Sequence, residues 1–296
     1  MTANDWAVAL GYFDGVHIGH RQLIKRLVEQ SRLMGLNTMV YTFRRHPLSV
    51  INPDNPVPLI YPPETRYRLI KQLGVDKVIM APFNIRISKM APEDFLEEVL
   101  FENYSIRYVA VGFNFRFGYR GAGDVDLLNK TGVKNNIKVD VIKPVDLDGE
   151  VVSSSYIRKL LEAGDIEKAN RCLGSYYSVS GRVIKGMGRG NGMGIPTANI
   201  RLPREVLYPA SGVYITNTIY QNKKYKSITN VGTKPTFPEG RIGIETYIDG
   251  ISRNLYNQLI HLEFYKKIRE EKKFKNIGEL KNQIELDIKY LENYFY

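Results

Sequence analysis

The sequence is poor in cysteine, in histidine and in long apolar runs. Of its 296 residues, one is cysteine (Cys172) and four are histidine. A single cysteine excludes an internal disulfide bond, which favours a reducing compartment. No apolar run approaches the roughly 18 residues of a membrane span, and the first ten residues lack the basic and apolar segments of a secretory signal. These absences predict a cytoplasmic protein without a membrane partner.

Acidic residues are also scarce, and the shortage is uneven. Residues 1–170 hold 22 Lys/Arg and 20 Asp/Glu, whereas residues 171–296 hold 20 and 11. A basic half suits nucleic acid, a membrane surface or small phosphorylated molecules, and it also keeps a protein soluble. The excess of positive charge does not choose among these alternatives.

What is present is the composition of a folded protein. The chain is 43% hydrophobic and 25% charged, which excludes a disordered, collagen-like or coiled-coil chain. A single core usually stops growing at about 250–300 residues, so two domains are expected, with one large α/β domain as the alternative. The sequence pattern changes near residues 165–175, and we therefore expect domains at 1–168 and 169–296.

The first half alternates β-type runs with helical periodicity, which is typical of a parallel sheet with crossover helices. The expected strands are residues 6–10, 38–43, 77–81, 108–111 and 139–142. The expected helices are residues 21–34, 65–73, 92–101 and 154–172. Such a sheet binds its ligands at the carboxyl ends of its strands.

The second half consists of short β segments separated by Gly, Pro and Asn. The expected strands are residues 177–184, 212–220, 227–230, 242–248 and 259–264, and a helix is expected over residues 277–295. Regularly spaced short strands predict a small antiparallel barrel or a sandwich. We expect the last helix to close the barrel.

Two histidines lie between the first expected strand and the first expected helix. His17 and His20 flank Gly19, where a phosphate can approach the backbone and the amides that begin the helix. Such a site would stabilise charge on an α-phosphate during transfer. A His-x-Gly-His turn of this kind is typical of nucleotidylyltransferases with a Rossmann-like fold. The alternatives are two surface histidines or half of a zinc site.

Two further segments of the first half fit this interpretation. Residues 152–158 open a helix with three serines, among them Ser154, and with Arg158, which together could hold a triphosphate. Residues 111–118 follow a strand, so that Asn114 and its aromatic neighbours could meet a flat acceptor. Serine caps and core aromatics are the simpler explanations.

The second half has its own candidate nucleotide site. Glycine occupies every second position from Gly186 to Gly194, which predicts a mobile loop whose amides wrap phosphate. Thr197 and Asn199 stand at alternate positions, so both could face Mg²⁺ held with a nucleotide. Glu245 stands in an apolar run and is therefore either paired with a cation or functional, as a general base. A flexible hairpin is the alternative for the glycine segment.

Seven segments of the chain, taken in order, resemble the motifs of one family. These are residues 13–20, 42–47, 111–118, 153–158, 194–200, 212–214 and 230–237. The chain resembles the bacterial bifunctional riboflavin kinase/FMN adenylyltransferases, the prokaryotic FAD synthetases. The resemblance implies a Rossmann-like nucleotidylyltransferase domain followed by a riboflavin-kinase barrel. It also implies two ATP-dependent steps, riboflavin to FMN and FMN to FAD with release of pyrophosphate.

The resemblance also implies a role for particular residues. The family's catalytic residues match Glu245, as the base of the kinase reaction, together with His17 and His20. Its ATP-binding residues match Phe13, Gly15, Gly19, Ser154, Arg158, Gly186, Gly194, Thr197 and Asn199, and Thr197 and Asn199 would also hold Mg²⁺. Its flavin-binding residues match Asn114, His46, Asn230 and Arg269. No nucleic-acid partner is expected, and the chain is expected to be a monomer or a weak homo-oligomer.

The sequence departs from the family pattern at residues 155–156 and in the segment 247–257 that follows Glu245. Two other functions stay open on the sequence. One is a nucleotidylyltransferase for another acceptor, which leaves the glycine-rich segment and the Pro-Thr-Ala-Asn that follows it unexplained. The other is a flavin-sensing or nucleic-acid-binding protein on the same fold.

Overall fold

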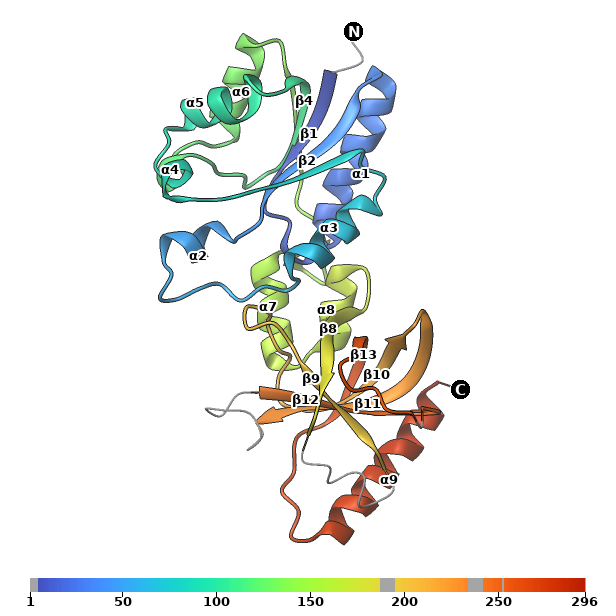
Figure 1. Ribbon diagram of the computed structural model, residues 1–296. Coiled ribbons are helices and arrows are strands. Elements are labelled where there is room, and N and C mark those ends of the chain that lie inside the picture. The colour runs from blue at the N-terminus through green and yellow to red at the C-terminus, as the bar shows by residue number, and fades with distance from the viewer. Residues whose placement is uncertain (1–4, 187–194, 234–241, 252, 296) are drawn as a thin grey trace. The chain divides into compact units, whose positions relative to one another are not determined.

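The computed structural model describes residues 5–186, 195–233, 242–251 and 253–295 (Figure 1). The chain divides into two compact units, Met1–Ser154 and Ser155–Tyr296. Each unit has its own sheet, as two separate cores require. No helix among the described residues is long and apolar enough to cross a membrane.

The first unit is built on a parallel five-stranded sheet. Its strands are β1 (Asp5–Leu10), β2 (Asn37–Phe43), β3 (Lys77–Ala81), β4 (Ser105–Gly112) and β5 (Lys138–Ile142). The strand order is β3-β2-β1-β4-β5, and every neighbouring pair is parallel. The direction of winding changes between β1 and β4. Ligands of open α/β sheets bind at such a point, outside the carboxyl ends of the strands, which here are the loops that follow β1 and β4.

Helices cover both faces of this sheet. Helix α1 (Ile18–Met34) packs Leu23, Ile24 and Leu27 against small residues of β1 and β4. The opposite face is covered by apolar residues from Phe95 to Leu100 and by Leu128. The other helical segments are η1 (Asp14–Val16), α2 (Pro47–Ile51), α3 (Pro63–Lys71), α4 (Ile85–Ser88), α5 (Pro92–Asp94), the π-helix η2 (Phe95–Phe101), η3 (Tyr119–Gly121) and α6 (Val125–Lys134), and β6 (Asp146–Leu147) and β7 (Glu150–Val151) form a hairpin.

Two short helices come before the barrel of the second unit. The predicted single helix over residues 154–172 is wrong in one respect, since it is broken into α7 (Ser154–Ala163) and α8 (Ile166–Leu173). Gly164 has a φ of +80°, which glycine adopts without strain. Asp165 then caps α8 by accepting the backbone N–H of Lys168 at 3.1 Å. These two residues explain the break.

The second unit is a closed barrel, as predicted, and not a sandwich. Its strands are β8 (Tyr177–Ile184), β9 (Thr197–Arg201), β10 (Gly212–Tyr220), β11 (Lys223–Thr233), β12 (Ile242–Ile248) and β13 (Leu259–Arg269). Their order is β10-β11-β12-β9-β8-β13, and all pairs are antiparallel. Pairing of β10 with β13 closes the barrel. Helix α9 (Ile277–Tyr294) packs Leu291 against Val213, Ile215 and Ile228.

The two faces of the barrel wall differ. On one face, the hydroxyls of Thr216, Ser227, Thr229 and Thr246 are fully buried and bond one another across three strands, at 2.7 to 3.0 Å. Successive side chains of a strand point to opposite faces. The residues between these hydroxyls therefore lie on the other face, where α9 packs.

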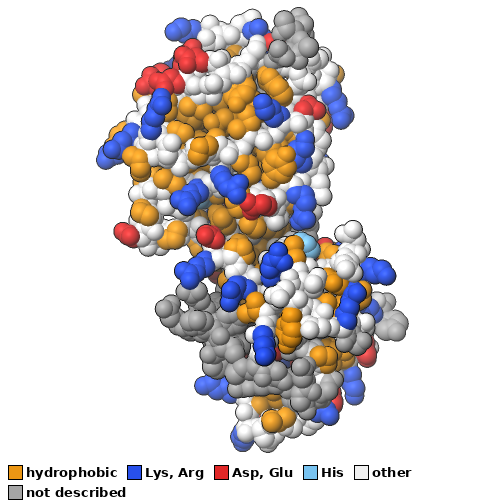
Figure 2. Space-filling model, viewed as in Figure 1, with side chains coloured by type: hydrophobic (Ala, Val, Ile, Leu, Met, Phe, Trp, Pro, Cys, Tyr) orange, Lys and Arg blue, Asp and Glu red, His pale blue; other side chains and the backbone are white. Residues whose placement is uncertain are grey.

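The surface carries both apolar and basic side chains. Figure 2 shows hydrophobic side chains gathered on one face of the first unit, and Lys and Arg side chains spread over both units in that view. On the face shown, the positive charge is thus distributed and not collected in one patch.

Candidate functional site

The turn that follows β1 is strained and tightly held. Phe13, Gly15 and Val16 all have positive φ values, of 58°, 77° and 43°. A β-branched residue such as Val16 rarely adopts this conformation, which costs about 1–3 kcal/mol. The carboxylate of Asp14 opposes the strain by accepting the backbone N–H groups of Ile60 and Tyr61 at 3.0 and 3.2 Å. Strain of this kind is typical of functional sites.

Two stacked imidazoles stand at the end of this turn. His17 caps α1, because its Nδ1 accepts the backbone N–H of His20 at 3.3 Å. The two rings are stacked with centroids 3.5 Å apart, and Phe13 meets His20 edge-on. A Cβ on Gly19 would come within 3.3 Å of the His17 ring, so glycine leaves that ring its place. The sequence motif therefore forms one site at a helix N-terminus, where anions are stabilised.

Both imidazoles are uncharged at neutral pH. Burial lowers the pKa of His17 to about 4. Burial also lowers the pKa of His20 well below its ordinary value, with smaller contributions from His17 and from the Arg66 guanidinium. A neutral imidazole can donate one hydrogen bond to a phosphate oxygen without being titrated by it. The pair is thus suited to hold a phosphate and not to transfer a proton near pH 7.

The burial of His17 predicts a pH-dependent loss of stability in the first unit. The unfolded chain takes up a proton on this residue near pH 6.5, whereas the folded chain does so only near pH 4. Stability from His17 is therefore full above about pH 6.5 and falls by about 3 kcal/mol as the pH drops to about 4. Trp6 is the only tryptophan, so its fluorescence during urea unfolding reports on this unit. Between pH 7 and 4, the free energy of unfolding should fall less steeply with decreasing pH in His17→Gln than in the parent protein. An equal fall in both proteins would contradict the prediction.

A buried arginine ties together the loops that follow β1 and β2. Arg66, on α3, is 1% exposed. Its guanidinium donates to the carbonyl oxygens of Tyr12 at 2.7 Å, Phe43 at 2.6 Å and Arg44 at 3.2 Å, and it lies 4.1 Å from the Tyr12 ring centre. Sequence reasoning missed this residue. Nothing in the pattern of α3 marks it, because its partners are carbonyls of distant loops.

The other predicted residues of the first half differ in whether they contact this turn. Ser154 donates its hydroxyl to the Asp14 carbonyl oxygen at 2.9 Å and so joins the turn. His46 caps α2 and meets the Tyr12 ring edge-on at 4.5 Å. Asn114 is exposed in the loop after β4. Arg158 lies one helical turn beyond Ser154 on α7, within the second unit.

In the barrel, four predicted residues meet on three adjacent strands. Asn230 of β11, Glu245 of β12 and Asn199 of β9 are direct cross-strand partners. The Thr197 hydroxyl donates to Oε1 of Glu245 at 2.5 Å. Asn230 and Glu245 stand next to the buried hydroxyls of Thr229 and Thr246, and on β9 Thr197 and Asn199 flank Ala198, the cross-strand partner of Thr246. All four therefore lie on the face of the barrel wall opposite to the hydroxyls. We call these four residues the polar row.

Other residues singled out in the sequence lie near the polar row along the chain. A Cβ on Gly186 would overlap the side-chain amide of Asn199, so glycine is needed there if Asn199 is to keep its position. Gly194 and the rest of the glycine-rich segment, 187–194, lie outside the described residues. Tyr247, where the sequence departs from the family pattern, is the cross-strand partner of Thr197.

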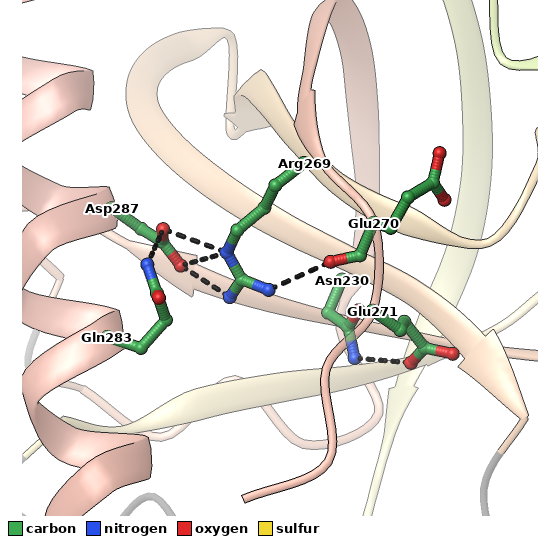
Figure 3. A network of polar contacts seen from close by, with 6 residues as sticks. All are labelled: Asn230, Arg269, Glu270, Glu271, Gln283 and Asp287. Atoms are coloured by element: carbon green, nitrogen blue, oxygen red, sulfur yellow. Dashed lines mark hydrogen bonds and ion pairs between the residues drawn. The ribbon is translucent and has the colours of Figure 1, made fainter.

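Arg269, predicted to bind flavin, is held by an ion pair at the end of β13 (Figure 3). Its guanidinium makes two contacts to the carboxylate of Asp287 on α9, with Nε 3.0 Å from Oδ1 and Nη2 2.7 Å from Oδ2. Gln283 donates to the same carboxylate at 3.0 Å. Paired in this way, Arg269 fixes the end of β13 to α9.

The oxygen atoms of the polar row fit a magnesium ion. Thr197 offers a hydroxyl, Asn199 a carboxamide oxygen and Glu245 a carboxylate, and Mg²⁺ prefers such ligands together with substrate phosphates. Among the described residues, no group of three or more His, Cys, Asp or Glu comes together to hold a metal. Water molecules or the phosphates of a nucleotide would complete the ligands of a Mg²⁺ ion at this row.

Both places present groups of a kind that suits phosphate, and they differ in their chemistry. The first offers neutral hydrogen-bond donors at a helix N-terminus, and the second offers a carboxylate beside metal-type oxygen ligands. Together they define a two-domain transferase of phosphorus-containing groups.

Comparison with known proteins shows which transferase family this is. The family model for FAD synthetase matches residues 1–156, and the model for riboflavin kinase matches residues 173–295. The bifunctional riboflavin kinase/FMN adenylyltransferase of Bacillus subtilis is 35% identical over 97% of this chain and 92% of its own. The Escherichia coli K12 protein of the same name is 32% identical over 95% and 90%. The chain belongs to the bifunctional riboflavin kinase/FMN adenylyltransferase family.

A solved structure shares the fold of nearly the whole chain. A crystal structure described as a macrolide-efflux protein from Streptococcus pneumoniae is 28% identical, with a TM-score of 0.89 over 99% of this chain and 95% of that chain. The two family models and the named relatives confirm the predicted family, the two-part fold and the predicted pair of transferase activities, riboflavin kinase and FMN adenylyltransferase.

Proposed function

We propose that each activity belongs to one part of the chain: residues 1–168 adenylylate FMN and residues 169–296 phosphorylate riboflavin. The two family-model matches leave most of α7 and α8 between them, which supports a boundary in this region. The observation that carries the proposal is the polar row, in which Glu245 lies beside Thr197, Asn199 and Asn230.

In the kinase reaction, Glu245 takes the proton of the ribityl 5′-hydroxyl of riboflavin. The freed oxygen attacks the γ-phosphorus of ATP, the bond from that phosphorus to the β–γ bridging oxygen breaks, and ADP leaves with the electron pair. Thr197 and Asn199 would hold Mg²⁺, which neutralises phosphate charge when it is bound. The hydrogen bond from the Thr197 hydroxyl keeps the Glu245 carboxylate in place.

In the adenylylation reaction, a phosphate oxygen of FMN attacks the α-phosphorus of ATP and pyrophosphate leaves. FMN is already an anion at neutral pH, so this step needs no general base. Neutral His17 and His20 donate hydrogen bonds to the α-phosphate, and the amides at the start of α1 add theirs. Phe13, Gly15, Gly19, Ser154 and Arg158 would complete the ATP site, and His46 and Asn114 would contact the flavin.

Flavin chromatography tests the proposal. Purified protein is incubated with Mg·ATP and either riboflavin or FMN, with and without EDTA. We expect FAD from both substrates, FMN as the intermediate from riboflavin, and loss of both conversions in EDTA with recovery on added Mg²⁺. No conversion of either flavin would overturn the proposed reactions, and full conversion in EDTA would overturn the metal site.

We also propose that the protein is cytoplasmic and that it is a monomer or a weak homo-oligomer, with no nucleic-acid or membrane partner. Cys172 is the single cysteine, and a chain without a disulfide framework fits a reducing setting. Size-exclusion chromatography with light scattering at several concentrations measures the oligomeric state.

A further inference from the structure

A carboxylate outside the predicted site lies against the polar row. Glu271 comes two residues after Arg269, and its Oε1 accepts a hydrogen bond from Nδ2 of Asn230 at 3.2 Å (Figure 3). A Cβ on Gly232 would overlap the same carboxylate. Asn230 and Gly232 share a face of β11, so one residue binds the carboxylate and the other leaves room for it.

The chain around Glu271 is held from the side of α9. Arg269 pairs with Asp287, and its Nη1 donates to the Glu270 carbonyl oxygen at 3.1 Å. Asp287 is 5% exposed. Arg269 therefore fixes the backbone next to Glu271 to α9, and the Glu271 side chain extends from this fixed backbone to Asn230.

The contact decides which end of the Asn230 carboxamide faces which way. An ionised carboxylate only accepts hydrogen bonds, so the NH₂ group of Asn230 is turned toward Glu271. Its Oδ1 is then turned away from Glu271, where it is buried and has no hydrogen-bond partner among the described residues. A buried acceptor without a partner is costly, and a substrate donor would satisfy it.

We propose that Glu271 is a positioning residue of the kinase site, which presents Asn230 Oδ1 as an acceptor for a hydroxyl of the riboflavin polyol chain. The inference rests on the proposed function, which places the terminal hydroxyl of that chain at Glu245. Asn230 is the direct cross-strand partner of Glu245, and such partners lie about 5 Å apart. When the terminal hydroxyl of the polyol chain lies at Glu245, the hydroxyls that precede it can therefore reach Asn230.

A polarity swap tests the proposal. In Asn230→Asp, two carboxylates face each other, and we expect kcat/KM for riboflavin to fall at least about tenfold. In Asn230→Asp combined with Glu271→Gln, the glutamine donates and the aspartate keeps an acceptor toward the substrate. We expect the double variant to recover to within about threefold of the parent. Failure of the double variant to recover would overturn the proposal.

Two single variants separate positioning from a structural role. Glu271→Ala should raise KM for riboflavin about five- to tenfold with little change in kcat, and Gly232→Ala, which displaces the carboxylate, should do the same. FMN to FAD conversion in the same preparation should be unchanged and shows that the chain is folded. A fall in kcat at unchanged KM would contradict the proposal.

The proposed function can be judged in the same experiment. If Glu245→Gln still phosphorylates riboflavin, the placing of the kinase reaction at the polar row is wrong. If Glu245→Gln is inactive and the swap does not recover, only the role of Glu271 is wrong.

Discussion

Replacement of Glu245 by glutamine will abolish the conversion of riboflavin to FMN and leave the conversion of FMN to FAD intact. The amide keeps the shape and can still accept the Thr197 hydroxyl, but it cannot take a proton from the substrate. Loss of a general base lowers the rate about 10²- to 10⁴-fold. Initial rates of both reactions, followed by flavin chromatography on one preparation, measure this difference.

Glu263→Gln is a matched control for this change. Glu263 lies on β13 of the same barrel, where it pairs with Lys224 at 2.8 Å. The same replacement there should leave the kinase rate within about twofold, since Glu263 is not part of the polar row and its partner Lys224 is exposed. An active Glu245→Gln enzyme, or one that is folded and has lost both reactions, would contradict the assignment of two separate sites.

Replacement of His17 will have the opposite effect. His17→Ala removes a donor to the α-phosphate, and loss of one such donor lowers the rate about 10²- to 10³-fold. FAD formation from FMN should fall by this amount while riboflavin is still phosphorylated, so that FMN accumulates in the riboflavin reaction. The measurement is the ratio of FMN to FAD over time.

The capping role of His17 calls for a second variant. His17 also caps α1 through Nδ1, and loss of a cap costs about 1 kcal/mol. His17→Asn restores a good cap without an imidazole. We expect it to be as inactive in FAD formation as His17→Ala but more stable. An active asparagine variant would show that the cap is what the reaction needs, and not the imidazole.

Much of the fold could be predicted because its strands carry their own pattern. The strands predicted over residues 177–184, 212–220 and 242–248 have the bounds observed for β8, β10 and β12. β11 and β13 are longer than predicted. Lys223, Lys224 and Lys226 of β11 and Lys266 and Lys267 of β13 are among the extra residues, and these polar residues are extended because they pair with β10. Pairing with a distant strand cannot be read from local alternation.

The residues of the candidate site also differ in whether the local sequence reveals them. His17, His20, Thr197 and Glu245 lie in short motifs or in apolar runs that mark them as unusual, and these motifs could be recognised. Arg66 and Glu271 act through carbonyls and an amide that are far away in the sequence, at separations of 22 to 54 residues. Their neighbours in the sequence reveal nothing of these contacts, which only the tertiary structure provides.

The strand order of the barrel has a consequence for how the chain folds during synthesis. β8 pairs with β13, which lies at the far end of the barrel sequence, whereas all five strands of the parallel sheet come before residue 143. The parallel sheet can thus form while the ribosome still makes the barrel. Until β13 emerges, β8 and β10 each keep one unpaired edge, and such edges recruit other chains. Truncation or ribosome stalling before residue 259 therefore leaves a folded first unit attached to an incomplete barrel that is prone to aggregate.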